Sequence, residues 1–182
     1  MPASLQKSIA ADILIKITEE FCDFCEKSND LKLEKKIFHL SKLLSDLQAA
    51  IYKIQSDDID TFPKVETYKQ PPSLSENFLD FGIFEGYTLT LEPFALTKKG
   101  FSTSGIGVGS LKDDISDIYW DLKRALHFYH HPSGSTSETI WDLCFHYNTH
   151  WGYHLVNAQR ILFEALQDLG IILPISKNSF SS

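Results

Sequence analysis

The chain has 182 residues, of which 43% are hydrophobic, and its formal net charge is −7. This length fits one domain with a sizeable core, the apolar fraction excludes a wholly disordered chain, and the negative charge argues against nucleic acid as a partner. No stretch resembles a secretory signal or reaches the ~18 apolar residues of a spanning helix, and three cysteines do not make a disulfide framework. The sequence therefore predicts a cytoplasmic protein with no membrane partner.

The first third of the chain predicts two helices. Apolar residues recur at steps of three and four from Leu5 to Phe24, and again from Leu33 to Ile54, so that each stretch presents one apolar face. The short break between them favours an antiparallel helical hairpin. The heptad-like spacing of the second stretch would also suit a dimeric coiled coil, so a homodimer is the alternative.

The following stretch, residues 57–110, predicts an irregular connector because its four prolines rule out a long helix. Within it, Ser73–Phe81 could form a short helix, and Tyr87–Glu92 alternates like a strand. The glycine-rich run Gly105–Ser110 matches no phosphate-binding motif, and Asp113 and Asp114 directly after it would repel an anion. We expect this run to be a flexible connector.

In the last third of the chain the apolar residues again recur with helical spacing. The pattern predicts one helix from Leu111 to His130 and another that continues to Leu169, with a bend near Gly152. The fold class is therefore all-α, a bundle of four to five helices with a short irregular or β-like excursion. We expect a single helical domain over residues 1–182, made of a hairpin (1–56), the connector (57–110), an acidic helix and a histidine helix (111–170) and a tail (171–182).

Cys22 and Cys25 form a C-x-x-C pair, which can serve as a redox couple or as half of a zinc site. They lie late in the first helix among carboxylates that would raise the thiol pKa, and Cys144 is the one other cysteine. The sequence favours a structural role for this pair.

An acidic stripe runs along the third helix, on the flank of its apolar seam. Asp114, Asp117 and Asp121 follow one another at steps of three and four, which places them on one face. A solvated stripe balanced by Lys123 and Arg124 is the plainer interpretation. Carboxylates this close repel one another unless a positive group is near, which favours a site.

Three histidines follow one another at steps of four in the last helix. Two histidines at this spacing can bind one metal ion from one helix face, but three span too much of the helix for one ion. His150 and His154 are predicted to lie nearest the apolar face, with His146 closer to solvent. The motif H-E-x-x-H is absent because Trp151 follows His150, so a metal would need carboxylates from another helix.

A short loop joins the acidic and histidine helices, so antiparallel packing would bring the two flanks together. Because Gly152 has no side chain, another helix could approach closely there or a pocket could form. The aromatic side chains that could line such a pocket are those of Trp141, Trp151 and Tyr153. The outcome is either a structural network or a small polar site. The polar-site candidates are Asp114, Asp117, Asp121, His150, Trp151 and His154, and the metal candidates, for Zn, Mn or Fe, are Asp117, Asp121, His150 and His154.

These residues resemble an uncharacterised bacterial family, domain of unknown function 5063, well over Tyr87 to Leu166 and in outline over the first two helices. One difference is Trp120, which stands where an arginine often follows the tyrosine, and it predicts that a basic partner of the aspartates is missing. The resemblance implies no activity. It is carried by Glu92-Pro93, Ser110-Leu111, Asp113-Asp114-Ile115, Asp117-Ile118-Tyr119, Asp121-Leu122-Lys123, Trp141, Phe145, His150-Trp151-Gly152 and His154.

Two functions follow as hypotheses. The first is a non-catalytic helical protein that binds a protein partner or small ligand, because no complete catalytic motif is present. The alternative is a metal-binding protein or metal-dependent hydrolase that uses Asp114, Asp117 or Asp121 with His150 and His154.

Overall fold

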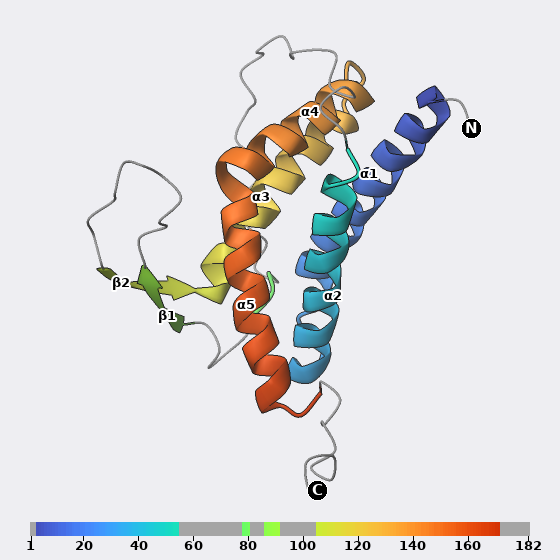
Figure 1. The fold of residues 1–182 in the computed structure, drawn as a ribbon. Helices are drawn as coiled ribbons and strands as arrows, with labels where there is room; N and C mark the ends of the chain where they lie inside the picture. The colour runs from blue at the N-terminus through green and yellow to red at the C-terminus, as the bar shows by residue number, and fades with distance from the viewer. Residues whose placement is uncertain (1–2, 55–77, 81–85, 92–104, 172–182) are drawn as a thin grey trace, which may run out of the picture.

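The computed structural model describes residues 3–54, 78–80, 86–91 and 105–171. Helices α1 and α2 run side by side, and α3, α4 and α5 pack along them (Figure 1). The predicted all-α bundle is confirmed. Among the described helices, none combines the length and the apolar character needed to cross a lipid bilayer. In chain order the elements are α1 (Ala3–Lys27), α2 (Leu33–Ile51), β1 (Gly86–Leu91), β2 (Gly105–Ser110), α3 (Leu111–Tyr129), α4 (Thr136–His146), the π-helix η3 (Tyr147–Trp151) and α5 (Gly152–Asp168).

The predicted helical hairpin is formed by α1 and α2. A tight turn joins them, in which the amide of Leu31 donates to the carbonyl of Ser28 at 3.1 Å. The apolar seam of α2 is fully buried at Leu40, Leu44 and Leu47, and α2 packs on α1 and α5. Burial of this seam inside the chain removes its apolar surface from water, which is the main favourable contribution to folding.

The third helix begins at a side-chain cap, as the sequence predicts. The hydroxyl of Ser110 accepts a hydrogen bond from the amide of Asp113 at 3.3 Å, and Asp113 and Asp114 lie in the first turn, where negative charge complements the helix dipole. The hydroxyl of Ser135 caps α4 in the same way, accepting from the amide of Glu138 at 3.4 Å. These caps fix where the two helices start.

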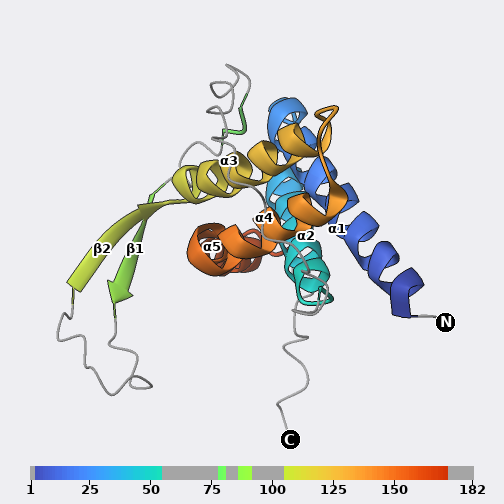
Figure 2. The same ribbon diagram turned by 90° about the horizontal axis from the view of Figure 1, so that it is seen from above.

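The strands form a two-stranded antiparallel sheet, in which Gly86 pairs with Ser110 and Leu91 with Gly105. Figure 2 shows this hairpin extending from the start of α3. The strand-like pattern at Tyr87–Glu92 is thus confirmed for β1, whereas the prediction of a flexible connector at Gly105–Ser110 was wrong. Strands pair through backbone hydrogen bonds, so glycines can form a strand without an alternating side-chain pattern. The partner strand β1 is also not adjacent in the sequence, so local patterns did not indicate β2.

The short helix predicted at Ser73–Phe81 lies largely outside the described residues. Residues 78–80, which are described, are not helical. Leu79 is buried and its amide donates to the carbonyl of Cys25 at 3.1 Å, while the ring of Phe78 lies 5.2 Å from that of Tyr119. This segment therefore contacts α1 and α3.

The histidine segment is not one continuous α-helix. It changes direction between α4 and α5 (Figure 1), close to the expected bend, and the five residues of η3 there are π-helical. The amide of Gly152 donates to the carbonyl of Tyr147, five residues back, and a Cβ at Gly152 would lie only 2.3 Å from that carbonyl oxygen. The extra residue in this turn changes which side chains face α3. At the far end, Gly170 has a φ of +65°, which ends α5 as predicted.

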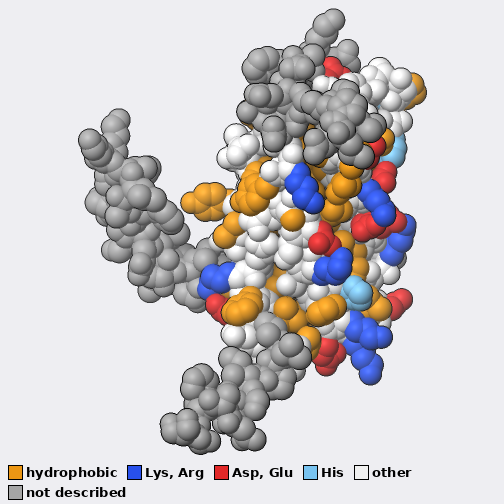
Figure 3. All heavy atoms as spheres, turned by 45° about the vertical axis from the view of Figure 1, so that its right-hand side comes forward, with side chains coloured by type: hydrophobic (Ala, Val, Ile, Leu, Met, Phe, Trp, Pro, Cys, Tyr) orange, Lys and Arg blue, Asp and Glu red, His pale blue; other side chains and the backbone are white. Residues whose placement is uncertain are grey.

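The surface carries both signs of charge. On the face shown in Figure 3, Lys and Arg side chains alternate with Asp and Glu side chains, and hydrophobic side chains lie between them. No basic stripe of the kind that binds a phosphate backbone is visible on that face.

Candidate functional site

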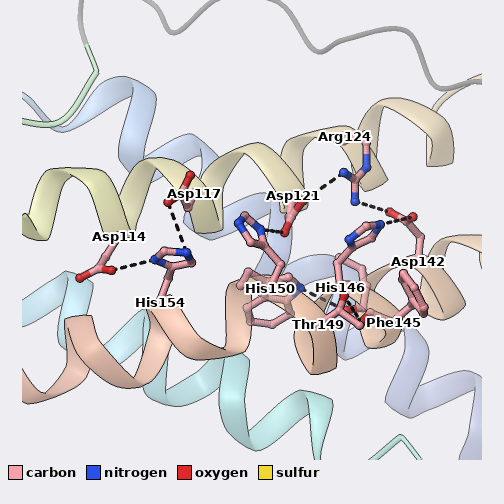
Figure 4. Close-up of polar contacts among 12 residues, drawn as sticks. Asp114, Asp117, Asp121, Arg124, Asp142, Phe145, His146, Thr149, His150 and His154 are labelled. Carbon is pink, nitrogen blue, oxygen red and sulfur yellow. Dashed lines mark hydrogen bonds and ion pairs between the residues drawn. The ribbon is translucent and has the colours of Figure 1, made fainter. Parts of the chain in front are cut away.

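The acidic flank of α3 and the histidine flank of η3 and α5 face each other, joined by three contacts between side chains (Figure 4). The Nδ1 atom of His150 lies 2.7 Å from Oδ2 of Asp121. The Nδ1 atom of His154 lies 2.8 Å from Oδ1 of Asp114, and its Nε2 atom lies 3.3 Å from Oδ2 of Asp117. The structure thus brings together five of the six candidates that the sequence analysis named.

The contacts continue from α3 to α4 through an arginine. The guanidinium of Arg124 lies 3.1 Å from Asp121 and 3.3 Å from the buried Asp142, whose other carboxylate oxygen lies 3.4 Å from Nε2 of His146. The expectation that the aspartates lack a basic partner was wrong, because Arg124 provides it one turn after Trp120. We call the connected residues the Asp/His network: Asp114, Asp117, Asp121, Arg124, Asp142, His146, His150 and His154.

Sequence reasoning missed Asp142. An aspartate is normally expected to be exposed, because charged residues are rarely buried unless they are paired, so the sequence did not indicate that Asp142 is buried. The available signal was its spacing of four from His146, which places the two on one face of α4.

The exposure of the three histidines differs from the prediction. The side chain of His150 is 48% exposed, whereas those of His146 and His154 are 26% and 25% exposed. The expectation that His146 lies nearest solvent was wrong. His146 bends back onto Asp142 in its own helix, and the π-helical turn after it shifts His150 relative to a regular α-helix.

The aromatic residues are not placed around the network as expected. Trp151 is fully buried, its indole nitrogen donates to the carbonyl of Leu143 at 3.1 Å, and it belongs to the core. Tyr153 is exposed, and Trp141 stacks on Phe145 with ring centroids 4.8 Å apart. Gly152 accommodates the Tyr147 carbonyl rather than a neighbouring helix.

The electrostatics of the Asp/His network favour a cation. It holds four carboxylates and one guanidinium, so it carries three net negative charges while its histidines are neutral. The hydrogen bond to Asp114 outweighs burial and raises the pKa of His154, and burial raises the pKa of Asp117 despite the nearby His154. Both shifts increase the affinity of this pair for a proton.

Three side chains could hold a metal ion. One donor atom from each of Asp117, His150 and His154 lies within 4.8 Å of the other two. With bonds of about 2.0–2.2 Å, neighbouring ligands of one tetrahedral ion are separated by roughly 3.3–3.6 Å. The 3.3 Å between His154 and Asp117 fits this range. The half-exposed His150 would have to turn inward for the full set.

Both histidines have the carboxylate partners typical of metal ligands. An aspartate accepts from Nδ1 of His150 and another from Nδ1 of His154, so Nδ1 carries the proton and Nε2 the lone pair in each neutral ring. In metal sites this arrangement fixes the ring and makes it a better ligand. Asp121, which we expected among the metal ligands, instead contacts Nδ1 of His150, and Asp114 contacts Nδ1 of His154.

Other candidate motifs lie away from the Asp/His network. Cys22 and Cys25 are buried in α1, where burial raises the pKa of both thiols, and both lack a disulfide. Cys22 lines a cavity of about 400 Å³ between α1 and α3, together with Lys123 and His130. No residue of the Asp/His network lines that cavity, so the cavity is not part of the candidate site.

Comparison with known proteins identifies a family and a fold. No curated protein matches the chain. A crystal structure, that of protein BF1032 from Bacteroides fragilis, is similar with a TM-score of 0.61 over 84% of this chain and 91% of that one, at 18% identity. At that identity the similarity shows the fold alone. The family model described as Domain of unknown function (DUF5063) matches residues 6–168, and the chain belongs to that family.

Proposed function

We propose that the protein binds one divalent transition-metal ion between α3 and α5, with Asp117, His150 and His154 as ligands. The observation that carries the proposal is the convergence of their donor atoms within 4.8 Å, with Nδ1 of each histidine held by an aspartate. A pair of imidazoles with a carboxylate suits Zn, Mn or Fe.

The charge around the proposed site supports the same function. Asp114 and Asp121 are buried, and a buried carboxylate is costly unless a positive group is close. A divalent ion next to both histidines would offset much of the net negative charge of the Asp/His network. A zinc ion held by these residues would lower the pKa of its bound water to about 7, so hydrolysis is the reaction class that the site would support.

Elemental analysis of protein purified without a histidine tag tests the proposal. We expect one ion per chain in the wild type, and loss of that ion in His150→Ala and in Asp117→Asn. The control is His127→Ala, which removes an exposed histidine from the same helix as Asp117 and should keep the ion. Protein that carries no ion and takes none up from added Zn, Mn or Fe would contradict the proposal.

A second candidate is a non-catalytic protein whose α5 binds a protein partner, including a second copy, with the Asp/His network as a structural layer. Tyr153, Val156 and Phe163 favour it because they are exposed apolar residues on the outer face of α5. Sedimentation equilibrium tests the homodimer. A dimer that Val156→Asp dissociates would support it, and a monomer at every concentration would argue against it.

A further inference from the structure

We infer that the ion keeps coordination positions open to solvent, and that these accept a small oxygen-donor ligand that is neutral or singly charged. This inference rests on the proposed metal site. It adds the class of molecule that the site would take.

The open coordination positions follow from the number of protein ligands and from the side of the ion on which they lie. The described residues offer three donors, from α3, η3 and α5, whereas Zn takes four ligands in most sites and Mn or Fe up to six. Asp114 and Asp121 are buried and close the inner side. His150 is half exposed and Asp117 about one-third exposed, so the outer side faces solvent.

The charge of the Asp/His network selects the ligand. One divalent ion does not cancel its three net negative charges, so a multiply charged anion such as phosphate would be repelled by carboxylates a few ångströms away. Arg124 is engaged by Asp121 and Asp142 and does not offer its charge to such an anion. A neutral carbonyl, a hydroxamic acid or water avoids this repulsion.

Cobalt(II) provides a spectroscopic test, because its visible absorption changes when a ligand enters or leaves. The full-length protein would be loaded with cobalt and titrated separately with acetohydroxamic acid and with inorganic phosphate, with gel filtration to show that the cobalt stays bound. We expect a saturable change with acetohydroxamic acid at a concentration about tenfold or more below that needed for phosphate. The His127→Ala variant should behave as the wild type.

The outcomes separate this inference from the metal site itself. Failure to bind cobalt at all would overturn the metal site. Bound cobalt whose spectrum does not respond to acetohydroxamic acid, or cobalt that the probe strips from the protein, would overturn the open positions. An equal response to phosphate would overturn the selection by charge.

Discussion

The imidazole of His154 lies 2.8 Å from the carboxylate of Asp114, and this contact joins α5 to the first turn of α3. Replacing His154 by alanine would leave the buried Asp114 with one hydrogen bond fewer. We expect a loss of about 1–3 kcal/mol in the free energy of unfolding, measured by urea denaturation without added metal. The matched His127→Ala variant should change it by less than about 0.5 kcal/mol. An equal effect of the two substitutions would show that the contact contributes no stability.

Gly152→Ala tests the π-helical turn. Alanine is favoured over glycine in a helix interior by about 1 kcal/mol, so propensity alone predicts a more stable protein. The new Cβ would lie 2.3 Å from the carbonyl oxygen of Tyr147, and we therefore expect the opposite sign, a loss of roughly 1–3 kcal/mol. Thermal and urea unfolding measure it, with the exposed Val156→Ala on α5 as control. A stabilised Gly152→Ala would mean that the turn readily reverts to an α-helix.

Asp121→Asn tests the support behind His150. The amide keeps the size of the side chain but removes the charge that holds Nδ1 of His150. Loss of such a partner typically weakens metal binding by roughly 10–100-fold. We expect that decrease in affinity by calorimetry, with one ion per chain retained. Unchanged affinity would show that Asp121 does not orient the ligand.

Glu26, which is not part of the Asp/His network, supplies a pH-dependent contribution to stability. Burial raises its pKa, but hydrogen bonds from Lys123 at 2.5 Å and Tyr119 at 2.7 Å outweigh it and hold the pKa below its usual value of 4.5. A carboxyl whose pKa is lowered by folding stabilises the protein above its unfolded pKa, and this stability is lost as the pH falls through the lower folded value.

We therefore expect Glu26→Gln to cost about 1–2 kcal/mol at neutral pH, and the difference from wild type to shrink below about pH 4.5. Urea unfolding across pH 3–7, a range chosen around that ordinary carboxyl value, measures it. Glu164→Gln is the control, because its pair with Arg160 is exposed and should contribute little. A difference that stays constant with pH would exclude this titration as its cause.

The sequence was sufficient for the bundle and for the meeting of its two polar flanks. The seam of α2 and the caps at Ser110 and Ser135 are local patterns, and they correctly placed the helices. The short connection between α3 and α4 was enough to bring Asp121 towards His150.

The remaining features depend on contacts that a periodic pattern does not encode. The ladder of β2 pairs residues that are 14 to 24 positions apart, so a local pattern predicts only a flexible glycine-rich run. The π-helical turn adds a residue, which an analysis at 3.6 residues per turn cannot follow, and it reversed the expected exposure of His146 and His150. Asp142 is joined to Arg124, and through it to Asp121, only because α3 and α4 pack together.

The most direct test of the account is equilibrium dialysis of metal-free, untagged protein against Zn, Mn and Fe(II), compared with the triple variant Asp117→Asn, His150→Ala, His154→Ala. We predict one tightly bound ion per wild-type chain and none in the variant, provided that circular dichroism shows both to be folded. Equal uptake by the two proteins, or no uptake by the wild type, would contradict a metal site between α3 and α5.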